Sequence, residues 1–118
     1  MPQNRNQFID IFIGNLANAI VHDILEKSIM NNEELRDKYS NKYRNELINS
    51  YNIAKRYRDK INPLDKTLPL KDIIYIKDQL KNKVQAELLS RINQGYQNIN
   101  LESIDQEIDE KFKELRIE

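Results

Sequence analysis

The chain has 118 residues, enough for one domain with a single core and too few for two well-buried ones. Its 19 basic and 19 acidic residues balance, so no long-range field attracts nucleic acid or an anionic membrane, and such binding would need a local patch. The absence of cysteine excludes disulfides, thiolate nucleophiles and cysteine-ligated zinc or iron–sulfur sites.

The most apolar part of the chain predicts a first helix from about residue 3 to residue 30. Its apolar side chains recur on one half of the helical wheel, and further apolar residues extend beyond that half. We therefore expect this helix at the centre of a bundle or at a subunit contact. Asp10, His22 and Asp23 would be costly inside a bilayer, so we expect no membrane span and a cytoplasmic location.

The next two segments predict two long helices. Asn31, followed three residues later by Glu34, resembles a capping signal, and an apolar stripe of helical spacing then runs from Leu35 to Ile61. Pro63 and Pro69 force a turn, after which a second stripe runs from Ile73 to Ile99. Because the connection is short, we expect the two helices to pack as an antiparallel hairpin.

A shorter fourth helix is predicted from about Leu101 to Leu115, after a weak point at Gly95 and a cap at Asn98 or Asn100. Glycine, proline and most β-branched residues are too scarce for a sheet protein of this size. The predicted fold class is therefore all-α: a small antiparallel bundle of about four helices, forming a single helical domain over residues 1–118.

One carboxylate breaks the apolar pattern of the first helix. Asp23 falls between Phe12 and Leu16 on the wheel, where an unpaired charge would be expensive to bury. We expect it to contact a basic or hydroxyl side chain of another helix or subunit. The alternative is a ligand-contacting or catalytic carboxylate in a cleft.

The second helix is electropositive, with eight basic and three acidic residues between Arg36 and Lys60. A nucleic-acid-binding protein would use such a face to hold phosphates, and the tyrosines of this helix could stack on exposed bases. A charged face is also what keeps a helix soluble. Alternatively, the acidic fourth helix, with seven acids against three bases in residues 100–118, covers the face. The candidate phosphate-binding residues are Lys38, Lys42, Arg44, Arg56 and Lys60.

Catalytic signatures are sparse. His22 is the only histidine, and it precedes Glu26 by one helical turn, a pair that could bind a metal or share a proton if other ligands converged on it. A metal- or carboxylate-dependent enzyme around His22, Asp23 and Glu26 is therefore only the third hypothesis, and no metal site or cofactor is predicted.

The leading hypothesis is a non-enzymatic helical interaction module that self-associates or serves as a small subunit of a larger assembly. It rests on the absence of catalytic motifs from the sequence and on the first helix, which has more apolar surface than the other three predicted helices would easily cover. A homodimer is the expected form, with Phe8, Phe12, Leu16 and Ile20 near the contact. Nucleic-acid binding through the second helix is the alternative.

Overall fold

The structure is a computed structural model that describes residues 5–62 and 66–118. These residues form helices and no strand, which confirms the predicted all-α class; the expected turn at Pro63 lies outside the described residues. The elements in chain order are α1 (Arg5–Ser28), α2 (Glu33–Ile61), α3 (Leu70–Asn93), the 3₁₀-helix η1 (Leu101–Ser103) and α4 (Ile104–Glu114).

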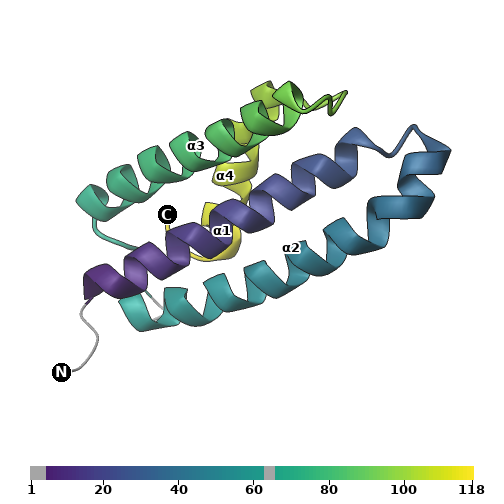
Figure 1. The fold of residues 1–118 in the computed structure, drawn as a ribbon. Coiled ribbons are helices and arrows are strands. Elements are labelled where there is room, and N and C mark those ends of the chain that lie inside the picture. Colours follow the sequence, from purple (N-terminus) through teal and green to yellow (C-terminus); the bar gives the residue numbers. More distant parts are fainter. Residues whose placement is uncertain (1–4, 63–65) are drawn as a thin grey trace.

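Helix α1 is the central element and lies between α2 and α3 (Figure 1). Its apolar residues are too many for one neighbour, and the fold covers them from several directions, as the sequence predicted for a position inside the bundle. Helices α2 and α3 do run antiparallel. However, each of them packs mainly against α1 and not against the other. Helix α1 therefore lies between the two helices that were expected to pack as a hairpin.

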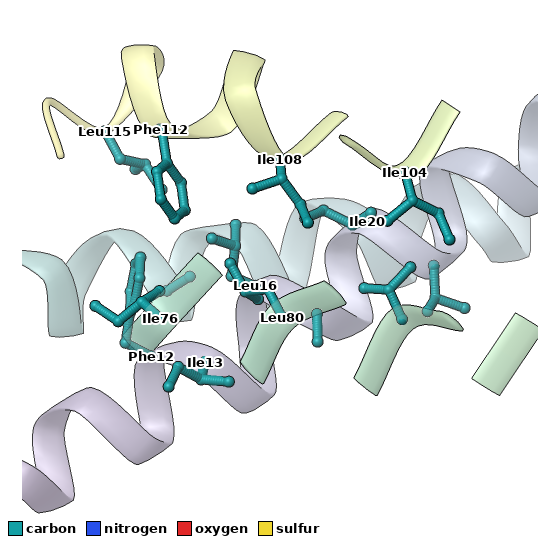
Figure 2. Packing of buried hydrophobic residues seen from close by; sticks show 14 of the residues in the cluster. Phe12, Ile13, Leu16, Ile20, Ile76, Leu80, Ile104, Ile108, Phe112 and Leu115 are labelled. Atoms are coloured by element: carbon teal, nitrogen blue, oxygen red, sulfur yellow. The ribbon is translucent and has the colours of Figure 1, made fainter. Parts of the chain in front are cut away.

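Helix α4 covers one side of this arrangement. Its residues Ile104, Ile108 and Phe112 are buried, as is Leu115 at its C-cap, and these side chains point toward those of α1 and α3 (Figure 2). Burying such side chains contributes roughly 1.5–3 kcal/mol each, which is enough to hold a helix of only three turns. These α4 side chains share one buried cluster with residues of α1 and α3, which include Phe12, Leu16, Ile20, Ile76 and Leu80.

Another side of α1 remains open to solvent. Asn6, Gln7, Asp10 and Gly14 are exposed there. The fold is therefore a three-helix layer that α4 covers. By length and composition α1 could also cross a membrane, but 56% of its most apolar window is buried within the chain, as in a core helix.

The ends of the helices differ by a few residues from the predicted ones. The N-cap of α2 is Asn32 rather than Asn31, since its side chain accepts a hydrogen bond from the Leu35 amide at 3.0 Å. Helix α3 stops at Asn93, so Ile99 is not part of it. Gly95 adopts φ +102°, and the Tyr96 amide donates to the Arg91 carbonyl, which completes a Schellman cap.

Candidate functional site

The outer face of α2 carries four cations, Lys38, Lys42, Arg56 and Lys60, which we call the basic stripe. All four are exposed, and none forms an ion pair with a described residue. Lys38 lies over the ring of Tyr39 and Lys60 over that of Tyr57, at 5.3 and 4.7 Å from the ring centroids. At 1.5 Å per residue the stripe is about 33 Å long.

The acidic residues of α4 do not cover the basic stripe. Glu107 pairs with Lys27 of α1, while Asp105 and Asp109 pair with Lys81 and Lys77 of α3. Within one chain, the C-terminal helix therefore does not neutralise the basic stripe, while its covering by the C-terminal helix of a second chain stays a prediction. The reason is geometric, because α4 packs mainly on α3 and α1.

The fifth predicted phosphate ligand, Arg44, lies apart from the stripe. Its Nη2 atom is 2.6 Å from the Glu26 carboxylate of α1, although the side chain is still well exposed. This pair raises the pKa of the Arg44 guanidinium, first through the hydrogen bond and then through the charge of Glu26. Arg44 is thus already partnered within the chain.

A further basic residue of α2, Arg58, has a structural role that the sequence analysis missed. It is fully buried, yet it forms no ion pair with any carboxylate of residues 5–62 and 66–118. Its Nε donates to the carbonyl of Leu115, and its Nη2 donates to those of Lys66 and Arg116, each at 2.8 Å. Its Nη1 donates to Asn62. The signal in the sequence was its position on the apolar side of α2, one residue after Tyr57.

Arg58 therefore joins three segments that are distant in the sequence: the end of α2, the residues before α3, and the C-terminus. Burial lowers the pKa of its guanidinium, although an arginine remains protonated in proteins. The Leu68 amide donates to the Ile117 carbonyl at 3.1 Å beside it, so the C-terminal residues are held in two ways.

Asp23 has different partners from those expected. Its carboxylate is 3.6 Å from Lys27 on the same helix, and the residue that it meets on another helix is an acid, Glu107 of α4. Arg44 of α2 interacts with Asp23 through its charge but pairs with Glu26, and a contact of Asp23 with another subunit stays a prediction. Lys27 lies between the two carboxylates, with its Nζ 2.5 Å from Glu107, and so partly balances both.

The surroundings of Glu107 favour its protonated form. The Glu107 side chain is 5% exposed, and its Oε2 atom has no donor among the described residues unless one carboxyl group of the pair is protonated. Burial first, and then the hydrogen bond to Asp23, raise the pKa of Glu107 to about 7, against the opposing effect of Lys27. Asp23, Lys27 and Glu107 thus form a polar contact between α1 and α4.

The residues of the enzyme hypothesis do not converge. The Nδ1 atom of His22 lies 2.8 Å from the Asn18 carbonyl, and its ring meets the edge of Tyr43. Glu26 forms an ion pair with Arg44. Within residues 5–62 and 66–118, no three histidine or acidic side chains are grouped closely enough to hold a metal ion.

The residues predicted for a dimer contact lie inside the chain. Phe12, Leu16 and Ile20 have no exposed surface, and Phe8 is half-buried with its ring 6.1 Å from that of Tyr57. Three of the four therefore belong to the core of one chain. A contact between two chains in this fold would need other residues.

A cavity of about 310 Å³ lies at the end of the bundle where α2 begins and α3 ends. We call it the tyrosine pocket, because three of its lining residues are tyrosines. Two of them come from α2 and the third from the segment after α3. Its lining residues are Ser28, Ile29, Leu35, Tyr39, Tyr43, Gln94, Gly95, Tyr96 and Gln97.

Comparison of the chain with protein-family models, curated proteins and solved structures gives no significant match, so the geometry described above carries the functional argument.

Proposed function

We propose that this protein is a non-enzymatic binding module whose partner is a nucleic acid, held by its phosphates along the basic stripe of α2. The observation that supports this proposal is that the four cations are exposed on one helix face without an acidic partner among the described residues. Elsewhere, the cations Lys27, Lys77 and Lys81 are paired with acids of α4.

The composition of the stripe suits a phosphate backbone. Asn45, Asn49 and Asn52 are exposed between its two pairs of cations, and their amides can donate hydrogen bonds to phosphate oxygens. Lys42 and Arg56 have no partner within the described residues, so their donors are available without breaking an internal contact. A net charge of zero limits the range of the attraction, and binding should therefore be strongest at low salt.

The test is fluorescence anisotropy with a labelled duplex and a labelled single strand, titrated at several salt concentrations. The variant Lys42→Glu/Arg56→Glu should weaken binding of both, and should reduce the slope of log affinity against log salt by about 2. The matched control is Lys71→Glu/Lys83→Glu, which makes the same change of charge at two exposed lysines of α3. Equal effects of the two variants, or no binding at low salt, would refute the proposal.

Self-association is the second candidate, and a specific surface favours it. Leu70 and Ile74 of α3 are 71% and 60% exposed, and they lie one turn apart on the same face. Exposed large apolar pairs of this kind occur at contacts between subunits. Light scattering should then show a dimer that Ile74→Lys dissociates, whereas a 14 kDa particle at every concentration would remove this candidate.

A further inference from the structure

The tyrosine pocket offers a preorganised aromatic surface. The rings of Tyr39 and Tyr43 are stacked, with centroids 6.0 Å apart and an angle of 18° between their planes. Tyr96 is held by Arg91, which lies over its ring and donates to its hydroxyl group at 3.2 Å. Because these side chains are already ordered by one another, a flat ligand would lose little binding energy in ordering them.

The pocket adjoins one end of the basic stripe. Lys42 lies about 60° around α2 from Tyr39 and about 4.5 Å along it. Lys38 is the preceding residue and already contacts the Tyr39 ring. A phosphate bound by these two lysines would therefore place its attached base near the tyrosine rings.

The chemistry of the lining favours a base over other flat or apolar ligands. Among the described residues no carboxylate lines the pocket, and Lys38, which has no acidic partner there, stands beside it, so the pocket offers nothing to balance the charge of a cationic ligand. Gln97 lines the pocket without a partner among the described residues. Its amide can both donate to and accept from the edge of a base.

We propose that the tyrosine pocket receives one unpaired base of a single-stranded nucleic acid whose phosphates lie along the basic stripe. The inference rests on the proposed function, since it needs the stripe to hold the strand. A duplex keeps its bases stacked inside, so the pocket would give the protein a preference for single strands over duplexes.

The experiment measures the affinity of the full chain for three labelled DNA ligands by fluorescence anisotropy. The ligands are oligo(dT) of about 12 nucleotides, an abasic strand of the same length, and a duplex of that length. The variant Tyr96→Ala removes a ring on which the base would stack. It should therefore weaken binding of oligo(dT) by about 5- to 100-fold. Binding of the abasic strand and of the duplex should be unchanged. The matched control is Tyr75→Ala, which removes an exposed tyrosine of α3 outside the pocket.

Several outcomes separate this inference from the proposed function. Equal affinity for oligo(dT) and the abasic strand, or no effect of Tyr96→Ala, would overturn the pocket while leaving the stripe in place. Tyr39→Leu serves as a second pocket variant if circular dichroism shows that Tyr96→Ala is unfolded. Tyr96-dependent binding of tetramethylammonium but not of oligo(dT) would assign the pocket to a cationic ligand and overturn the inference. The stripe itself would be refuted if Lys42→Glu/Arg56→Glu weakened binding no more than its α3 control, or if no strand bound at low salt.

Discussion

Arg58 offers the sharpest test of how the bundle is held together. Methionine at this position would keep an unbranched, apolar side chain in the same space but would remove every donor. The carbonyls of Lys66, Leu115 and Arg116 would then lose a charged partner. A hydrogen bond to a charged group contributes roughly 1.5–3 kcal/mol, and losses at neighbouring acceptors are not additive.

We therefore expect Arg58→Met to lower the free energy of unfolding by about 3–5 kcal/mol, since water reaches only part of the vacated site. For a chain of this length that is a large part of a total of roughly 6–18 kcal/mol. In urea, with a slope of about 2 kcal/mol per M, the midpoint should fall by about 2 M. Circular dichroism of the helices measures the transition.

The control is Arg56→Met, two residues earlier on the exposed face, which should change stability by no more than about 0.5 kcal/mol. Hydrogen exchange adds a local readout. The Leu68 amide, bonded to Ile117, should lose protection in Arg58→Met but not in Arg56→Met. The reasoning fails if both variants unfold at the same urea concentration.

Three other changes test separate parts of the structure by the same urea titration. Gly14→Ala should stabilise the protein by about 0.5–1 kcal/mol, because the new Cβ meets no atom within 4 Å; a loss of stability would show that this face of α1 is covered. Asn32→Ala should cost about 1 kcal/mol by removing the cap of α2, and an unchanged midpoint would contradict the observed cap. A Glu107 pKa raised to about 7 means that the folded state binds more protons than the unfolded state, so stability should fall as the pH rises from about 4.5 to about 7. Glu107→Gln should flatten this decline, since its amide can donate to Asp23 while Lys27 still pairs with Asp23; a decline as steep as in the parent protein would rule out Glu107 as its source.

The sequence by itself determined the class of fold and the inner faces of most helices. Apolar residues at helical spacing predicted the buried side chains Ile104, Ile108 and Phe112 of α4, because periodicity is a local property that packing then uses. The same reasoning located the four exposed cations on α2. It also predicted a broadly buried first helix, from apolar residues that spread beyond half of its surface.

Only the tertiary structure decided which helices meet. Periodicity says which face is buried but not what covers it, so the sequence could not show that α1 separates α2 from α3. For the same reason Asp23 and Glu107, 84 positions apart, could not be paired in advance. The position of Arg58 on the apolar side of α2 indicated that it is buried, but not which carbonyls it binds. A charged side chain is free to bind a partner, or is used to hold the fold together, according to the carbonyls and carboxylates that distant segments place beside it.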